Sequence, residues 1–377
     1  EVYWNTTKDL LMAVPVDNTT GYSYQFQNFG KTSNRGIELS VNVDVINKGD
    51  FRFNVGAIYN YNRNKLDELP NADQYLYSSY WGSSSLVPTN DYMFVEGKAI
   101  GLVRGFISEG YYTVDDFNYT NGQYVLKEGV PDITKALTAT YMHPYDLPAG
   151  QTAFPGAAKF RDVDESGTVD LDDATCLGEV MPRHTGSFQL NFNYKNFDLS
   201  TNFNWTAGGK VYNVAAMINA SGQEFDGIGA QRASWVADAF KVYNVNAAGD
   251  LYAVTNPDEL RALNANAKYH LPYHQSGITS SEWLENGSYL RLQTLTLGYT
   301  LPKNWLAKVH VDKIRLYLTA TNLFTITGYS GIDPEVNANP TGQSGFYSDL
   351  RIFPTLNMDF GTYPRARTFT FGANITF

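Results

Sequence analysis

The chain of 377 residues carries a net charge of −10, with 18% charged and 15% aromatic side chains. An acidic chain without a basic run is a poor nucleic-acid binder, and the one cysteine, Cys176, excludes both an intramolecular disulfide framework and a cysteine-built zinc site. No run approaches the length of a transmembrane helix, whereas a hydrophobic content of 43% can support a core or an apolar belt and argues against disorder.

Alternation of apolar and polar residues is the strongest pattern, and it begins in a first hairpin. Every second residue from Ile37 to Val45 is apolar, and the pattern resumes from Phe51 to Tyr61 after the turn-forming residues 47–50. A period of two is the side-chain repeat of a half-buried β-strand. The sequence therefore predicts a β-hairpin with one apolar face.

Two further hairpins and a final strand continue this pattern. In the third hairpin the phase of alternation slips near Gln293-Thr294, which predicts a β-bulge. The last apolar run ends at Phe377. We predict about eight strands in all, near residues 2–14, 22–47, 50–64, 184–195, 197–207, 286–301, 312–324 and 365–377.

The connections between strands are of two kinds. Short hairpin turns alternate with long stretches at about 62–183, 206–285 and 325–364, and the strand-like segments 100–112 and 157–162 are assigned to the first of these loops. Short turns at one end and long loops at the other are typical of outer-membrane β-barrels, and a polar face rich in Asn, Ser, Thr and Gln suits a wet lumen. The predicted fold is all-β, an antiparallel transmembrane β-barrel sector with long extracellular loops; the alternative is a soluble β-sandwich.

A series of short segments follows the strands in a fixed order. They are NRGIEL at 34–39, FRDVDESGTVD at 160–170, NFNYKNFDL at 191–199, WLENGSYLRL at 283–292, LTLGY at 295–299, TNLF at 321–324, YSGIDPE at 329–335 and YPRARTF at 363–369. Together they resemble the carboxy-terminal part of SusC/RagA-type TonB-linked outer-membrane importers of Bacteroidetes.

This resemblance implies a barrel of about 22 strands in the bacterial outer membrane, with an amino-terminal plug and a SusD-like surface lipoprotein as lid. The TonB complex would energise import of oligosaccharides or peptides. About eight strands supply well under half of such a wall, so we expect residues 1–377 to be the carboxy-terminal portion. The plug, the TonB box and the first strands would belong to the remaining amino-terminal part of the same transporter. No signal peptide or start methionine precedes the first strand, which agrees with a piece of a longer protein.

An acidic segment within the first long loop, 162–173, has the spacing of a calcium-binding loop. Oxygen-bearing residues occupy its positions 1, 3, 5, 9 and 12, with a backbone carbonyl at 7 and a glycine at 6. The predicted ligands are Asp162, Asp164, Ser166, Thr168, Asp170 and Asp173. Asp at position 12 and extended residues before the loop depart from an EF-hand. A calcium ion would rigidify the loop; the alternative is an acidic, solvated turn.

Aromatic residues crowd an earlier part of the same loop. They are Tyr75, Tyr77, Tyr80, Trp81 and Tyr92. Flat aromatic rings suit the apolar faces of sugars, which predicts ligand binding here. The alternative is that these rings pack the loop itself or contact the lid protein.

The final strand carries apolar residues at alternate positions, including Phe369, Phe371, Ile375 and Phe377. This pattern resembles the carboxy-terminal signal read by the barrel-assembly machinery.

Three classes of function are weighed. The leading hypothesis is a sector of a nutrient importer whose apolar face is covered by membrane lipid. The alternatives are a secreted β-rich glycan-binding module and a surface glycosidase. No nucleophile elbow, paired catalytic His and Ser, Walker loop or Rossmann glycine set is present, so we predict no enzyme.

Overall fold

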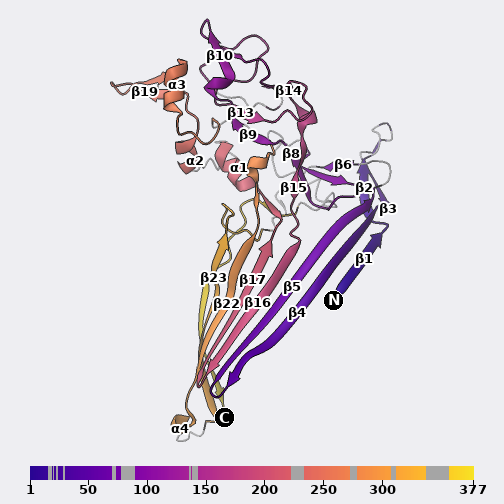
Figure 1. Ribbon diagram of the computed structural model, residues 1–377, viewed down its shortest axis with the longest axis vertical. Helices are drawn as coiled ribbons and strands as arrows, with labels where there is room; N and C mark the ends of the chain where they lie inside the picture. Colours follow the sequence, from indigo (N-terminus) through magenta and orange to yellow (C-terminus); the bar gives the residue numbers. More distant parts are fainter. Residues whose placement is uncertain are drawn as a thin grey trace.

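One antiparallel sheet dominates the computed structural model (Figure 1). The structure describes residues 1–15, 19, 21–22, 24–28, 30–69, 74–77, 90–135, 137, 143–221, 233–271, 278–306, 311–336 and 356–377. The sheet contains, in spatial and sequence order, β1 (Val2–Lys8), β4 (Lys31–Lys48), β5 (Phe51–Glu68), β16 (His184–Tyr194), β17 (Phe197–Ala207), β22 (Tyr289–Thr300), β23 (Lys313–Thr327) and β25 (Thr368–Thr376). The predicted number of strands is confirmed, and β1 and β25 form the two edges of the sheet.

The two earliest predicted strands are shorter than expected. Residues 2–14 divide into β1 and β2 (Leu11–Pro15), and residues 22–47 divide into β3 (Tyr24–Asn28) and β4. Asp9 and Gly30 adopt φ angles of 56° and 94°, and this left-handed backbone interrupts the extended chain at facing positions. The β2–β3 hairpin is therefore separate from the main sheet.

The predicted bulge in β22 is confirmed. Pairing with β23 slips between Leu292 and Thr294, and pairing with β17 slips between Asn202 and Phe203. Gln293 is the extra residue relative to β17, whereas in the pairing with β23 two residues, Asn322 and Leu323, stand opposite Gln293. The slip returns the even-numbered leucines before it and the odd-numbered leucines after it to the same face.

Cross-strand pairing aligns one apolar face across the sheet. One row contains Ile46, Phe53, Phe192, Leu199, Leu297, Leu318 and Phe371. The adjacent row on the other face contains Asp44, Asn54, Asn191, Ser200, Thr296, Thr319 and Thr370. The apolar side chains stay exposed, 54% at Leu39 and 73% at Phe371. A β-sandwich would bury such a face against a second sheet, so the sandwich alternative fails.

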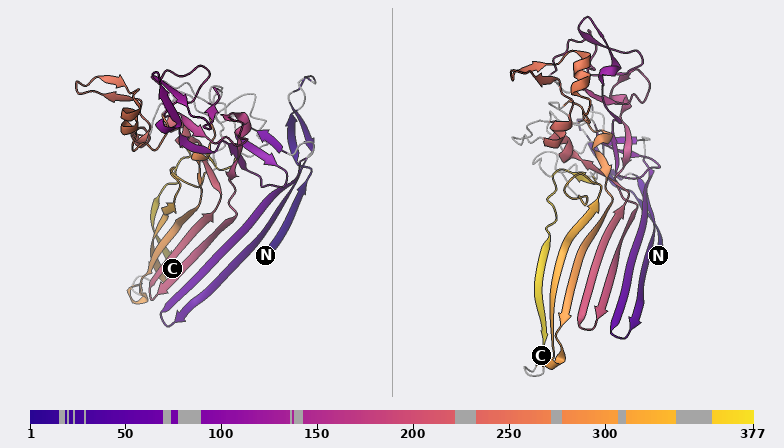
Figure 2. Two further views of the ribbon diagram at one scale, coloured as in Figure 1. Left: turned by 45° about the horizontal axis from the view of Figure 1, so that its top comes forward. Right: turned by 60° about the vertical axis from the view of Figure 1, so that its left-hand side comes forward.

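The long connections gather at one end of the strands (Figure 2). The first, after β5, holds the sheet β15-β8-β7-β6 and three small pairs. Its strands are β6 (Gln74–Tyr77), β7 (Tyr92–Val95), β8 (Leu102–Gly105), β9 (Ser108–Tyr111), β10 (Phe117–Thr120), β11 (Gln123–Leu126), β12 (Asp132–Ile133), β13 (Ala158–Phe160), β14 (Thr168–Val169) and β15 (Thr175–Glu179), with short helices η2 (Val114–Asp116) and η3 (Leu171–Asp173). The strand-like segments 100–112 and 157–162 thus lie within the loop, as predicted.

The second and third connections are also folded. They contain β18 (Lys210–Asn213), α1 (Val214–Ser221), α2 (Ala233–Asp238), β19 (Tyr243–Val245), β20 (Leu251–Ala253), α3 (Pro257–Leu263), η4 (Ser281–Trp283), β21 (Leu284–Asn286) and β24 (Met358–Asp359). α4 (Lys303–Leu306) lies at the opposite end, between β22 and β23. Among the helices in the described ranges, none combines the length and apolarity needed to cross a membrane.

Hydrophobic cores lie in the connections rather than behind the wall. One cluster, above the ends of the strands, includes Leu66, Val180, Tyr212, Trp283 and Met358. A second joins the first two connections and includes Phe106, Tyr112, Phe154, Phe240 and Leu260. Residues from separate connections share these cores, so the described parts of the connections form one platform rather than independent loops.

Candidate functional site

The polar face of the wall is joined by hydrogen bonds between strands. Asn54 Nδ2 donates to Asn42 Oδ1 at 2.7 Å and to Asp44 Oδ1 at 3.0 Å. Further along, Asn191 Nδ2 donates to Asn54 Oδ1 at 3.4 Å, and Ser200 Oγ donates to Asn191 Oδ1 at 2.6 Å. This ladder of amides and hydroxyls leaves few fixed charges on a face that can be wetted by water.

One ion pair on this face depends on a missing side chain. Arg315 Nε donates to Asp198 Oδ1 at 2.9 Å, and Arg315 NH2 donates to Oδ2 at 2.5 Å. The pair passes over Gly298, where an added Cβ would lie 2.4 Å from the Asp198 carboxylate. Glycine at this position is thus required for the two side chains to meet.

Aromatic rings border the apolar face at both ends of the strands. At the loop end, the Tyr59 hydroxyl lies 2.8 Å from His184 Nδ1, and the Tyr61 and Trp205 rings lie 5.1 Å from His184 and 6.1 Å from Tyr59. At the turn end the corresponding residues are Phe51, Tyr194, Phe197 and Tyr299. About ten residues of strand separate the two rows, which at a tilt of about 45° corresponds to roughly 23 Å. That height matches the apolar band of an outer-membrane barrel, about 25 Å.

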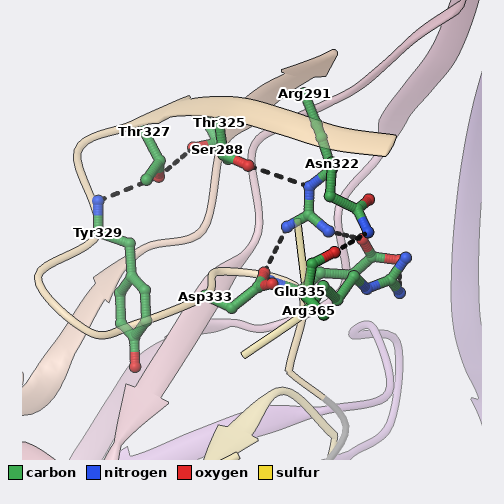
Figure 3. A network of polar contacts seen from close by, with 10 residues as sticks. Ser288, Arg291, Asn322, Thr325, Thr327, Tyr329, Asp333, Glu335 and Arg365 are labelled. Carbon is green, nitrogen blue, oxygen red and sulfur yellow. Dashed lines mark hydrogen bonds and ion pairs between the residues drawn. The ribbon is translucent and has the colours of Figure 1, made fainter. Parts of the chain in front are cut away.

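A buried arginine anchors the start of the third connection (Figure 3). Arg291, on β22, is 2% exposed; its NH2 lies 2.5 Å from Asp333 Oδ1, and its NH1 lies 3.2 Å from Glu335 Oε2. Its Nε donates to Thr325 Oγ1 at 3.1 Å. Arg365 closes the group by pairing with Glu335 at 2.6 Å. The network therefore joins both ends of the third connection to β22.

Neighbouring bonds hold the same segment to the other loop strands. Glu285, on β21, accepts from the Ser330 amide and hydroxyl at 2.7 Å and from Asn213 Nδ2 at 2.7 Å. The Tyr329 hydroxyl donates to the buried Asp359 at 2.6 Å. These contacts were not predicted from the sequence, although both segments involved, 283–292 and 329–335, belong to the series that resembles SusC/RagA-type importers. Their pairing depends on tertiary proximity that spacing along the chain does not reveal.

The acidic segment 162–173 brings together three of its predicted calcium ligands. Carboxylate oxygens of Asp162, Asp164 and Asp173 lie within 4.8 Å of one another. Asp173 is buried and accepts the amides of Val163 and Asp170 at 2.6 and 2.8 Å. The Asp170 carboxylate instead accepts the amide of residue 172 at 2.8 Å and caps the following short helix.

The middle of this acidic loop turns sharply. Gly167 adopts a φ of 87°, and its amide donates to Asp162 Oδ2 at 2.7 Å. Ser166 Oγ donates to the Thr168 carbonyl at 3.0 Å, so the two oxygens predicted at positions 5 and 7 bond each other. Hydrogen bonds from Ser166 lower the pKa of the Asp164 carboxyl. A group of convergent carboxylate oxygens suits a hard cation.

Two of the aromatic residues predicted to bind ligand, Tyr77 and Tyr92, are buried in the structure. Tyr77 and Tyr92 are 5% and 0% exposed, and their rings stack with centroids 5.5 Å apart. This corrects the prediction of direct ligand contact for these two residues: they belong to the core above the wall, because their rings are covered by the loop strands. Tyr75 lies on β6 but its side chain is outside the described part, as are Tyr80 and Trp81.

The predicted assembly-signal residues lie on the exposed apolar face. Phe369 and Phe371 pair with Ala320 and Leu318, and Ile375 pairs with Ile314. Phe377 is 86% exposed. Recognition of this strand during assembly stays a prediction.

A buried acid–base pair lies between the two loop cores. His270 Nε2 is 3.7 Å from Glu282 Oε2, and the Trp235 ring packs against His270 at 4.9 Å. Burial raises the pKa of Glu282 to about 7 and lowers the pKa of His270 to about 4. Both groups are therefore held in their neutral forms near pH 6.

Sequence relatives match the chain from end to end. It is 29% identical over 378 residues to TonB-dependent receptor P3 of Formosa agariphila, which covers 100% of the chain and 32% of that protein. It is 24% identical over 385 residues to TonB-dependent receptor SusC of Bacteroides thetaiotaomicron, covering 100% of the chain and 29% of that protein. The chain thus spans about a third of the length of the curated relatives it matches. No family model matches.

Solved structures agree with the fold. The structure of the RagAB peptide transporter superposes with a TM-score of 0.64 at 21% identity, covering 100% of the chain and 33% of that protein. The RagAB peptide importer in its closed-closed state gives a TM-score of 0.65 at 20% identity, covering 100% of the chain and 33% of that protein. The resemblance to the carboxy-terminal part of SusC/RagA-type importers, the β-barrel-sector fold and the outer-membrane localisation are confirmed. These relatives are named as receptors, transporters or importers rather than enzymes.

Proposed function

We propose that this chain is the carboxy-terminal wall sector of a TonB-dependent outer-membrane importer for oligosaccharides or peptides. The observation that carries this proposal is the apolar face, which runs in register across the sheet, stays exposed, and backs onto a hydrogen-bonded polar face. Water would cover such a face only at a large free-energy cost, whereas hydrocarbon tails cover it without one. The polar face then lines the passage.

The rest of the transporter would complete this wall. In the part of the chain that the structure describes, β1 and β25 are edge strands, so one side of each presents backbone groups without a neighbouring strand, which hydrocarbon does not tolerate. The remaining amino-terminal part, with plug and TonB box, would pair with both edges and couple the passage to the TonB complex. The chain's coverage of about a third of its relatives supports this division.

A SusD-like surface lipoprotein is the proposed lid, and it would rest on the platform formed by the connections. The platform has its own cores and is joined to the wall by the Arg291 network, so it offers an ordered base. The RagAB structure is named as a peptide transporter, and this supports a peptide cargo. An oligosaccharide cargo is supported only by the resemblance to the SusC/RagA family.

The test is site-specific labelling of the full-length protein in its membrane. Cys176 is exposed and would first be replaced by serine. We expect a lipid-phase probe to label Leu39→Cys and Val43→Cys, and a water-soluble thiol reagent to label Asn42→Cys instead. Equal aqueous labelling of all three, or a protein monodisperse without detergent, would instead support a secreted glycan-binding module.

We further propose that the acidic loop binds calcium and thereby rigidifies this part of the platform. The convergence of Asp162, Asp164 and Asp173 supports the site. Titrating the full-length protein with calcium should show a binding step that Asp164→Ala weakens strongly. Asp172→Ala is the control, because Asp172 is exposed and stands outside the convergent group. Identical titrations of wild type and Asp164→Ala would remove the proposal.

A further inference from the structure

Two arginines face each other just above the apolar belt. Arg35 on β4 and Arg63 on β5 are direct cross-strand partners, and Trp4 on β1 pairs with Arg35 on the other side. The next row toward the turns pairs Ile37 with Tyr61, so the arginine row follows the aromatic border directly. Since residues two apart on a strand point to the same side, both guanidinium groups lie on the apolar, lipid-facing side of the wall.

The two arginines place like charges directly opposite each other. Directly opposed side chains have Cβ atoms about 4.5–5.5 Å apart, and like charges there are destabilising. Other cations higher on the same face are paired, Lys65 with Asp67 at 3.4 Å and Lys31 with Glu68 at 2.8 Å. Within the described ranges, neither Arg35 nor Arg63 forms an ion pair. Both are exposed, so an external anion can reach them.

The residues around Arg35 and Arg63 suit a ligand that has both a phosphate group and an apolar tail. Guanidinium groups bind phosphate oxygens through paired N–H donors, and two forks side by side can share one phosphate group. The Arg35 guanidinium lies 3.7 Å from the centre of the Trp4 ring, which holds it against the wall. Trp4 is 65% exposed and stands at the height where amphipathic rings meet a membrane interface. Directly below, Ile37 and Leu39 offer an apolar surface for acyl chains.

We infer that Trp4, Arg35 and Arg63 form a binding site for the phosphorylated headgroup of an outer-leaflet lipid. The phosphate lies across the two guanidinium groups and relieves their repulsion, while the acyl chains follow the apolar face below. This inference rests on the proposed function, because that orientation places the loop end of the wall at the outer leaflet. A free phosphate ion shares the headgroup chemistry but makes no contact with the apolar belt.

The test compares lipids on the full-length protein in nanodiscs of phosphatidylcholine. The probes are diphosphoryl lipid A and the same lipid after enzymatic removal of its phosphates. We expect the phosphorylated form to bind wild type at least about tenfold more tightly, which corresponds to about 1.4 kcal/mol, because only this form offers charge-assisted hydrogen-bond acceptors to the two guanidinium groups. The double variant Arg35→Gln/Arg63→Gln should lose this preference.

Arg52→Gln is the matched control. Arg52 is an exposed arginine on β5, but it pairs with Asn47 and Asn193 and so lies on the polar face at the turn end. This variant should keep the wild-type preference. Equal binding of both lipids to wild type, or an unchanged preference in the double variant, would overturn the site. Competition by inorganic phosphate at equimolar concentration would overturn the lipid assignment in favour of a simple anion site.

Failure of this inference is distinguishable from failure of the proposed function. If the lipid-phase probe labels Leu39→Cys while lipid A shows no preference, only the headgroup site is wrong. If that residue is labelled from water, the membrane orientation itself is wrong. The comparison of two lipids on wild type needs no variant, so misfolding of the double variant would not leave the question open.

Discussion

Replacing Arg291 by methionine tests how the third connection is held to the wall. Met has an apolar stem of similar length but leaves the Asp333 carboxylate, 8% exposed, without its counter-charge. Removing one partner of a buried ion pair destabilises by about 3–5 kcal/mol. If this change lowers the free energy needed to open residues 328–336 locally, amide exchange there should accelerate by a factor of about 10²–10³ or more.

The assay is hydrogen exchange followed by mass spectrometry on the full-length protein, read at the Glu335 amide, which donates to Asp333 Oδ1 at 2.9 Å. Arg365→Met is the control, because the Arg365–Glu335 pair is partly exposed on both sides and should contribute about 1 kcal/mol or less. Adding Asp333→Leu to Arg291→Met removes the acceptor of the Glu335 amide, so this double variant is read at the Ser330 amide, which donates to Glu285 Oε2 at 2.7 Å. Protection there should recover, since an apolar pair can replace a buried ionic one. Wild-type exchange in Arg291→Met, or equal acceleration in Arg365→Met, would refute the reasoning.

Two further predictions concern the wall and the loop cores. Gly298→Val should separate the Asp198–Arg315 pair and lower the unfolding temperature of the full-length protein in detergent, whereas Gly56→Ala, whose added Cβ meets nothing closer than 3.9 Å, should not; equal effects would contradict the packing argument. His270 and Glu282 together bind one proton in the folded state near pH 5–6, as they do when unfolded, so their pH effects cancel there. In Glu282→Gln the depressed pKa of His270 remains alone, so stability should rise from pH 4 to 6.5 by up to about 1.4 kcal/mol per pH unit. In His270→Gln the raised pKa of Glu282 should make stability fall between pH 4.5 and 7, and flat curves in both variants would contradict the burial-shifted pKa values of the two groups.

Local pattern was sufficient to predict the wall. Alternation with a period of two identifies which residues share a face, so the apolar set from Ile37 to Val45 and the slip at Gln293 were readable before any contact was known. The same logic located the final strand and its exposed phenylalanines. The ends of the first two strands were predicted wrongly, because the chain breaks at Asp9 and Gly30 through left-handed backbone angles that alternation does not encode.

Within the candidate sites, spacing predicted some residues and missed others. The acidic segment did bring Asp162, Asp164 and Asp173 together, because its ligands lie within twelve consecutive residues. The aromatic cluster was misjudged at Tyr77 and Tyr92, since composition does not say whether a ring faces a ligand or a core. Their burial comes from strands that are distant in sequence.

The sequence by itself determined a membrane-type wall with one apolar and one polar face, because strand geometry ties face to residue parity over a few neighbours. Only the tertiary structure decided how the connections fold into a platform and where their charges pair. Arg291 and Asp333 are 42 residues apart, and the two loop cores combine residues from separate connections. Such contacts depend on chain closure over long distances, for which no local periodicity exists.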